Sequence, residues 1–149
     1  MRFLGNIEAK LDMKGRVFLP SVFRKVLQAS GEEKLVLRKD VHQPCLVLYP
    51  ESVWNERMDA LREQLNIWNK EHQQVMRKMN SEVEEASLDG NGRLLISKRL
   101  LEKAQIKQAI RFIGMDNVIE IWSPELLDST LESDEDFGME LEKILTIGS

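Results

Sequence analysis

Residues 9–19 read Ala-Lys-Leu-Asp-Met-Lys-Gly-Arg-Val-Phe-Leu, and residues 86–96 read Ala-Ser-Leu-Asp-Gly-Asn-Gly-Arg-Leu-Leu-Ile. Ala, Leu, Asp, Gly and Arg recur at the same spacing in the two stretches, 77 residues apart. A second correspondence follows, because Leu-Val-Leu-Tyr-Pro-Glu at 46–51 is answered by Ile-Glu-Ile-Trp-Ser-Pro-Glu at 119–125. An internal repeat of this kind constrains the whole architecture and outranks any single motif.

Each repeat predicts the same order of elements: a short strand, an Asp-x-x-Gly turn, a strand, a short helix, two strands and a helix starting at Pro-Glu. A unit of about 45 residues buries too little surface to be stable alone. We therefore expect an α+β protein whose two halves share one core as an internal pseudo-dimer. The expected segments are a first repeat at 1–50, a linking amphipathic helix at 51–80, a second repeat at 81–126 and an acidic C-terminal tail at 127–149.

Charge is distributed unevenly along the 149 residues, although the net charge is only −4. Residues 1–50 are net +4, residues 81–126 net −2 and residues 127–149 net −6. Only the N-terminal half therefore suits a polyanion, and the tail would repel one. No apolar run approaches the roughly 20 residues that span a bilayer, and the early charges do not fit a secretory signal. With Cys45 predicted as a buried small hydrophobe in a strand-like run, these features favour a cytosolic protein.

Residues 51–80 show helical periodicity. Their apolar residues are spaced alternately four and three apart, with one polar member: Trp54, Met58, Leu61, Leu65, Trp68, His72, Val75 and Met79. A single helix over 52–79 would be roughly 42 Å long at about 1.5 Å per residue. Its stripe either packs across the two strand-rich halves or forms an assembly surface, since heptad spacing is also coiled-coil spacing. With two histidines and one cysteine, the chain offers no zinc-ligand set, and we expect no metal and no cofactor.

The repeated turn combines geometry with chemistry. Asp12 and Asp89 can each accept backbone N–H bonds at the first turn position, and Gly15 and Gly92 can take a positive φ at the fourth. For the aspartates this structural role is a sufficient explanation. The arginine after each turn is less simply explained, because an exposed ion pair stabilises little.

Five cations fall within 16 residues of the first repeat, namely Lys10, Lys14, Arg16, Arg24 and Lys25. Clustered lysines and arginines can neutralise phosphates, and arginine can also form a bidentate contact with guanine in the major groove. A run of charge is more often only a solvated face. Composition alone therefore leaves nucleic-acid binding undecided.

Both halves of the chain resemble the MraZ family. Phe3-Leu4-Gly5 and residues 11–20 resemble its opening, and residues 88–96, 112–114 and 119–122 resemble its second half. The resemblance covers residues 3–126 in order. It implies two tandem AbrB/SpoVT-like swapped-hairpin repeats that form a pseudo-two-fold, β-barrel-like core, joined by the long amphipathic helix. It further implies a bacterial transcriptional repressor that acts on short direct repeats upstream of the division and cell-wall gene cluster, forms ring-shaped homo-oligomers and associates with the nucleoid.

Carried over residue by residue, the resemblance assigns DNA contacts first to the motif arginines, Arg16 and Arg93. Lys10 and the pair Arg24-Lys25 match further basic positions of the family, and Lys14 belongs to the same basic cluster. The second repeat departs from the pattern, because Leu101-Glu102 stand where Arg24-Lys25 stand in the first. It therefore either contacts DNA less or serves mainly as the other half of the fold.

Two functions from different classes are consistent with these features. The first is a DNA-binding repressor without catalysis, membrane attachment or a small-molecule ligand, in which several chains engage several repeats at once. The alternative is an oligomeric ring that acts through protein interactions, with incidental DNA binding. Its assembly would use the oligomer or core stripe, made of Trp54, Met58, Leu61, Leu65 and Trp68. An enzyme is a distant third, since no nucleophile–base set and no phosphate loop is visible.

Overall fold

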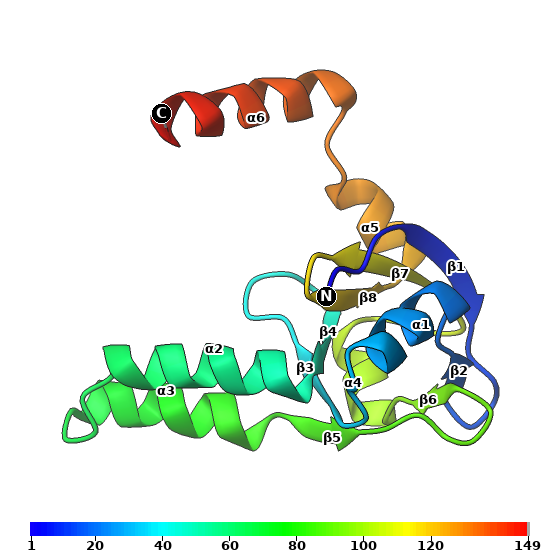
Figure 1. Cartoon of the computed structure of the whole chain (residues 1–149), viewed down its shortest axis with the longest axis horizontal. Coiled ribbons are helices and arrows are strands. Elements are labelled where there is room, and N and C mark those ends of the chain that lie inside the picture. Colours follow the sequence, from blue (N-terminus) through cyan, green and yellow to red (C-terminus); the bar gives the residue numbers. More distant parts are fainter. Residues whose placement is uncertain (149) are drawn as a thin grey trace.

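The computed structural model describes residues 1–148, which form a mixed α+β fold built on an antiparallel sheet (Figure 1). The same order of strands and short helix occurs in both halves, as the repeat predicts. The first half contains β1 (Asn6–Lys10), β2 (Arg16–Phe18), α1 (Ser21–Ala29), β3 (Leu35–Lys39) and β4 (Leu46–Pro50). The second half contains β5 (Glu84–Ala86), β6 (Arg93–Leu95), α4 (Lys98–Lys103), β7 (Ala109–Met115) and β8 (Val118–Trp122).

Strands of the two halves are interleaved. The larger sheet has the order β1-β7-β8-β4-β3-β5, so the first strand of each half lies on the hairpin of the other half. The two hairpins meet where β4 pairs with β8, and β2 pairs with β6 in a separate two-stranded ribbon. Exchanging the two halves maps the pairing of β1 with β7 onto that of β5 with β3, and maps the pairings of β4 with β8 and of β2 with β6 onto themselves. This is the pattern of a pseudo-two-fold axis.

The six-stranded sheet is open rather than closed into a barrel. Its edges are β1 and β5, and the ribbon of β2 and β6 forms a sheet of its own. Both halves nevertheless share one core. The ring of Phe23 meets the rings of Phe3 and Phe112 edge-on at centroid distances of 5.8 and 6.4 Å, and all three side chains are fully buried. One core cluster joins these rings to residues of β3, β4, β6, β7 and β8, so neither half has a core of its own.

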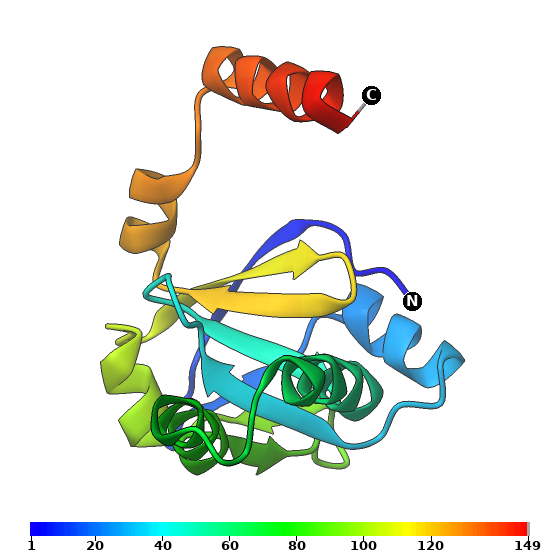
Figure 2. The same ribbon diagram turned by 90° about the vertical axis from the view of Figure 1, so that its left-hand side faces the viewer.

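Residues 51–80 do not form the single long helix that their periodicity predicts. They form α2 (Glu51–Gln64) and α3 (Lys70–Ser81), which lie side by side as a hairpin (Figures 1 and 2). Two asparagines make the reversal. The Oδ1 of Asn66 accepts the N–H of Trp68 at 2.9 Å, and the Oδ1 of Asn69 accepts the N–H of His72 at 3.0 Å as the N-cap of α3. Asparagine favours such local bonds over continuing a helix, and the four-three spacing persists across the reversal.

The reversal also divides the predicted stripe. Trp54 is buried at the base of α2, with its ring 5.1 Å from that of Tyr49. Met58 and Leu61 are half-buried along α2, Leu65 is half-buried just after its end, and Trp68 is 85% exposed in the turn. The stripe is therefore not one continuous surface. Trp54 belongs to the core, and Trp68 stands apart from the other members.

The acidic tail is helical. A short helix, α5 (Pro124–Thr130), begins at the predicted Pro-Glu start and packs Leu127 into a small cluster with Cys45 and Trp122. A second helix, α6 (Asp134–Gly148), follows and stands away from the rest of the chain (Figures 1 and 2). Cys45 is fully buried, as expected of a small hydrophobe, and burial raises the pKa of its thiol far above the ordinary value. No helix within residues 1–148 is long and apolar enough to cross a membrane.

We expect Gly114→Ala to destabilise the fold. A Cβ at this position in β7 would collide with the backbone of Phe3 and Leu4, which cannot move aside because Phe3 is fully buried. Overpacking of this kind costs about 1–3 kcal/mol, to be measured by thermal or urea unfolding. Gly90→Ala is the matched control, because a Cβ there meets nothing within 4 Å. Equal stability of the two variants would show that the N-terminal segment is not held against β7.

Candidate nucleic-acid interface

The two Asp-x-x-Gly-Arg turns have the same geometry. In the first turn, Asp12 Oδ1 accepts the backbone N–H of Lys14 and of Arg16, both at 2.9 Å. Asp12 Oδ2 accepts the side-chain Nε–H of Arg16 at 2.8 Å. In the second turn, Asp89 binds the backbone of Asn91 and Arg93 at 2.9 Å and the Nε–H of Arg93 at 2.8 Å. Each aspartate therefore closes its turn and also orients the arginine that follows.

The glycines connect the two turns to each other. Gly15 and Gly92 have φ values of +82° and +81°, which L side chains rarely adopt. The carbonyl of Gly15 accepts the N–H of Ile96 at 2.9 Å, and the carbonyl of Gly92 accepts the N–H of Leu19 at 3.0 Å. Each turn thus holds the strand that follows the other turn. The predicted motif residues therefore form one structure on the pseudo-two-fold axis.

The ribbon of β2 and β6 presents two arginines and two apolar residues on one face. Val17 and Leu94 are buried on the inner face, so the alternate residues point outward. In register, Arg16 lies opposite Leu95 and Phe18 opposite Arg93. These four form the outer ribbon face, on which Phe18 is 59% and Leu95 61% exposed. The guanidinium of Arg93 lies 5.9 Å from the centroid of the Phe18 ring.

Phe18 and Leu95 were not among the residues predicted from the sequence, and they lie on the same face of the ribbon as Arg16 and Arg93. The strand alternation in Arg-Val-Phe and Arg-Leu-Leu contains the signal that could have found them, because a buried middle residue puts both neighbours on the other face. Arg16 and Arg93 are diagonal neighbours across the ribbon, a relation that places Cα atoms roughly 7–8 Å apart. Among the described residues, each guanidinium is held by its own aspartate through Nε, and no protein acceptor meets its two terminal nitrogens. Those nitrogens are free to bind a ligand.

Both turn aspartates are held in the ionised state. The backbone N–H of Arg16 is the main reason that the pKa of Asp12 lies below its ordinary value of 3.8, and the backbone N–H of Arg93 does the same for Asp89. The Asp–Arg ion pairs are therefore fully charged near neutral pH. Their carboxylates also repel phosphate, so the arginine tips are the parts of the motif suited to a polyanion.

Arg24 and Lys25 differ in accessibility. The Nε–H of Arg24 donates to the carbonyl of Leu19 at 2.9 Å, and its guanidinium packs over Gly92, where a Cβ would meet Nη1 at 2.7 Å. Leu101 takes the corresponding place over Gly15 in the other half. Arg24 is half-buried and part of the scaffold, whereas Lys25 is exposed on α1. The second repeat has basic residues at 98 and 99, just before the positions that match Arg24 and Lys25, and Arg99 is paired with Glu84 at 2.7 Å.

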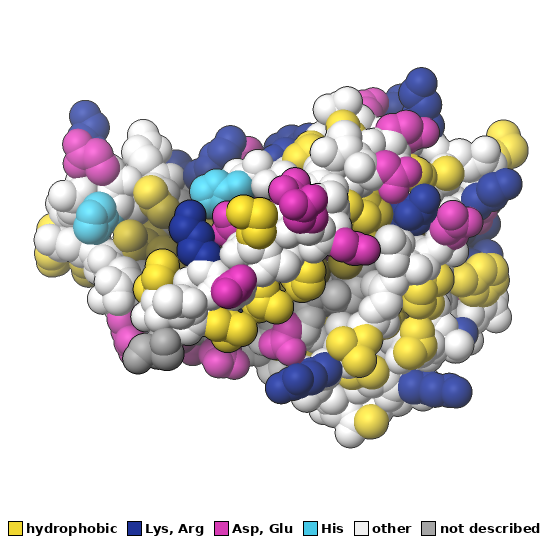
Figure 3. Space-filling view, turned by 90° about the horizontal axis from the view of Figure 1, so that it is seen from above, with side chains coloured by type: hydrophobic (Ala, Val, Ile, Leu, Met, Phe, Trp, Pro, Cys, Tyr) yellow, Lys and Arg dark blue, Asp and Glu magenta, His cyan; other side chains and the backbone are white. Residues whose placement is uncertain are grey.

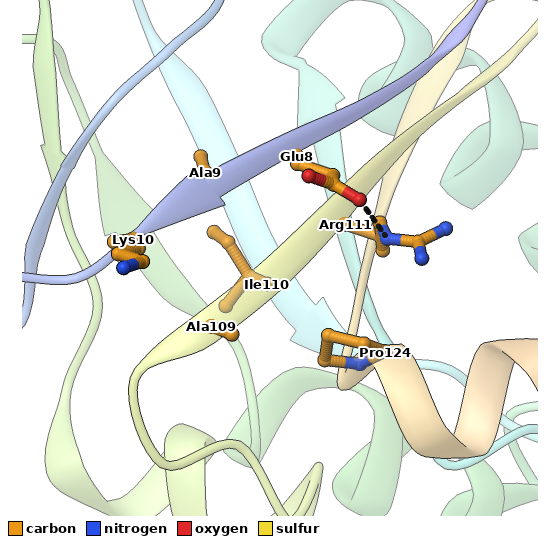
Figure 4. A pocket seen from close by; sticks show the side chains of 7 residues that line it. All are labelled: Glu8, Ala9, Lys10, Ala109, Ile110, Arg111 and Pro124. Carbon is orange, nitrogen blue, oxygen red and sulfur yellow. Dashed lines mark ion pairs between the residues drawn. The ribbon is translucent and has the colours of Figure 1, made fainter.

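Lys10 and Lys14 are both exposed, Lys10 two residues before the first turn and Lys14 within it. Lys10 ends β1 and lines a pocket of about 340 Å³ between β1, β7 and the start of α5 (Figure 4). The floor of this pocket is apolar, and its other end is closed by an ion pair between Arg111 and Glu8 at 3.6 Å. Lys14 therefore lies in the turn that precedes Arg16, whereas Lys10 lies at the edge of the larger sheet.

No other chemical site stands out within residues 1–148. Groups of three or more His, Cys, Asp or Glu that could hold a metal ion are absent from the described residues. His72 is half-buried, and its Nδ1 accepts the N–H of Asn66 at 2.8 Å. This histidine therefore has a local structural role, as its position in the periodic segment suggests.

Comparisons with known proteins match nearly the whole chain. A family model described as "MraZ protein, putative antitoxin-like" matches residues 2–78 and, separately, residues 79–143. Proteins named transcriptional regulator MraZ are 61% identical in Phocaeicola vulgatus and 55% identical in Bacteroides thetaiotaomicron. Each comparison covers 97% of this chain, and it covers 94% of the Phocaeicola vulgatus protein and 93% of the Bacteroides thetaiotaomicron protein. A more distant relative of the same name, from Christiangramia forsetii, is 34% identical over 97% of this chain and 94% of its own length.

We expect the pKa of Asp12 to rise only part of the way in Arg16→Gln. The largest cause of its lowered pKa is the backbone N–H of residue 16, which the substitution retains. Carboxyl NMR titration measures this pKa, with Asp89 in its unchanged turn as the internal control. Because both folded pKa values are lowered, the stability that these turns contribute is present above the ordinary aspartate pKa of 3.8 and is lost as the pH falls through the folded values. Full reversion of Asp12 would show that the side-chain pair dominates.

Proposed function

The chain belongs to the MraZ family, and on this premise we propose that it is a sequence-specific DNA-binding repressor. Its relatives are named transcriptional regulators, so a role in transcription regulation follows from the family. The observation that carries the finer proposal is the outer ribbon face, on which two aspartate-oriented arginines project with free guanidinium tips.

The outer ribbon face has the form of a major-groove reader. The major groove of B-DNA admits a two-stranded β-ribbon, and several DNA-binding proteins insert one there. Arg16 and Arg93 would each direct a terminal fork toward guanine O6 and N7, while Nε stays bound to the aspartate. Phe18 and Leu95 would supply apolar contacts to thymine methyl groups. Prior orientation by Asp12 and Asp89 reduces the side-chain entropy lost on binding.

Phosphate contacts would come mainly from the first repeat. Lys14 and Lys25 are exposed there, and Lys10 adds a third cation near the first turn. The second repeat has Leu101 and Glu102 at the positions of Arg24 and Lys25. We therefore propose that both arginines read bases, with the backbone contacts unequal between the two halves.

The proposed target is the set of short direct repeats upstream of the division and cell-wall gene cluster that the family resemblance implies. Several chains in a ring would engage several repeats at once, and effective concentration would multiply the weak contacts of each chain. Association with the nucleoid follows from that mode of binding. The interleaved strands are compatible with a swapped-hairpin arrangement of AbrB/SpoVT-like type, which we propose as the architectural class.

A second candidate function is an interaction ring with incidental DNA binding. It is favoured by the apolar side chains exposed away from the ribbon, including Trp68, Phe137 and Ile144. Such a protein would not need free arginine tips on a ribbon. The two functions are separable, because only the repressor depends on Arg16 and Arg93.

We expect Arg16→Gln and Arg93→Gln each to weaken binding to the upstream repeats by about 1–3 kcal/mol, roughly 5- to 150-fold in Kd. Each substitution removes a bidentate base contact and leaves the ribbon backbone intact. Fluorescence anisotropy with upstream and scrambled DNA at two salt concentrations measures the loss and its sequence dependence. Arg62→Gln, an exposed arginine on α2, is the matched control. Unchanged affinity in both ribbon variants would favour the interaction ring.

Lys25→Gln and Arg24→Gln should differ in kind. Lys25 is exposed, so its loss should weaken binding to all DNA sequences by the same factor. The slope of log affinity against log salt concentration should fall by about one, and Tm should not change. Arg24→Gln should lower stability by about 1–2 kcal/mol, because it removes the donor to Leu19 from a half-buried site. Thermal unfolding and salt-dependent titration of both variants test the contrast. A stable Arg24→Gln protein with only a DNA defect would instead make Arg24 a direct contact.

A further inference from the structure

Helix α6 carries an apolar stripe that no residue within 1–148 of its own chain covers. The stripe consists of Phe137, Leu141, Ile144 and Leu145, which fall on one face at helical spacing and are 42–63% exposed. Every residue from 131 to 147 is exposed, and Figure 3 shows hydrophobic side chains lying bare between acidic ones on this face of the molecule. A lone 15-residue helix with two glycines is marginal in water, so α6 needs a partner surface.

The α2–α3 hairpin also has apolar side chains that are only partly covered. No residue of α3 is buried, and α2 buries only Val53 and Trp54, at its base. Beyond the base, the apolar residues that fall on one face of each helix are only half-buried, and together they form the hairpin seam: Met58, Leu61, Leu65, Met76 and Met79. Val75, beside this seam, is 45% exposed. Two helices alone therefore leave the seam open along one side.

The two surfaces match in length and in charge. Helix α6 has 15 residues and α2 has 14, so each is about 21–23 Å long. Helix α6 carries five acidic residues and one lysine, whereas α3 carries three basic residues and one glutamate. Pairing between two α6 helices would bring like charges together, which disfavours it. The α3 side of the hairpin is the surface whose charge suits α6.

Within one chain the two surfaces are apart. Helix α6 is joined to α5 by residues 131–133 and stands apart from the hairpin, at the top of Figures 1 and 2, whereas the hairpin lies toward the bottom. We propose that α6 of one copy packs into the α2–α3 hairpin of a second copy and completes a three-helix bundle. The contact is heterologous, so repetition from copy to copy produces a ring where the rotation closes. This deepens the proposed assembly by naming its surfaces.

Cysteine cross-linking tests which surfaces meet. Glu140 lies near the middle of α6 and Val75 near the middle of α3, so the two come opposite each other in either helix direction. Co-expressed Glu140→Cys and Val75→Cys chains, carrying different tags, should form a mixed covalent dimer with a short bismaleimide. Neither variant alone should cross-link, and the native chain, whose Cys45 is buried, is the blank. A chain that carries both substitutions should not cross-link within itself. Such a cross-link within one chain, or a cross-link between two Glu140→Cys chains, would overturn the proposal.

A second test uses the mass of the full chain in solution. Leu141→Glu puts a charge into the stripe, and the assembly should fall to the 17.3 kDa monomer in light scattering. Met139→Glu is the matched control, because Met139 is 65% exposed on the opposite face of the same helix and the assembly should persist. A monomeric native protein, or equal masses of the two variants, would overturn the proposal.

The affinity for a single DNA repeat distinguishes failure of the proposed α6 contact from failure of the proposed repressor function on which it rests. Leu141→Glu should bind a single repeat with native affinity, because the outer ribbon face is unchanged, and should lose only the gain from several adjacent repeats. If the native protein assembles through α6 but does not bind DNA, the proposed repressor function is wrong and the proposed three-helix bundle stands. Loss of single-repeat binding in Leu141→Glu would mean that α6 acts on the DNA face and not on a second copy.

Discussion

Reciprocal hydrogen bonds between the two turns tie the halves of the chain to each other. Gly15 accepts from the strand that follows the second turn, and Gly92 accepts from the strand that follows the first. Neither bond can form unless both halves are in place, and the same holds for the pairings of β1 with β7 and of β5 with β3. The shared core requires the same arrangement, so folding of either half is conditional on the other.

Function is proposed at the point where this constraint is strongest. The ribbon that joins the halves holds Val17 and Leu94 in the core, and the same strand geometry turns Arg16 and Arg93 outward. Each aspartate uses one oxygen to close the backbone turn and the other to aim an arginine. Structural and functional readings of the motif aspartates are therefore compatible. The atoms that stabilise the turn also determine the direction in which the guanidinium projects.

Much of the fold can be predicted from local sequence patterns. The features that cannot be predicted depend on contacts between residues far apart in the sequence. The repeat and its turn chemistry predict the element order, because an Asp-x-x-Gly turn encodes its own hydrogen bonds. The helical hairpin was missed because four-three spacing is the same in a straight helix and in two helices joined at Asn66 and Asn69. Whether the sheet closes depends on strands far apart in sequence. The role of Arg24 depends on Gly92, 68 residues away, so composition could show its charge but not its burial against the other turn.

Because the interleaved halves belong to one chain, their pairing does not depend on protein concentration, and their sequences can differ from each other. A dimer of separate chains dissociates as its concentration falls, whereas two halves within one chain meet at a fixed effective concentration, so the ribbon persists at any copy number. In a true homodimer every substitution also appears twice. Here a change enters one half alone, and the pair of Arg24 over Gly92 and Leu101 over Gly15 is the result. Covalent linkage thus releases the two halves of the ribbon from the requirement to be identical, and the proposed interface would meet a target in one preferred direction.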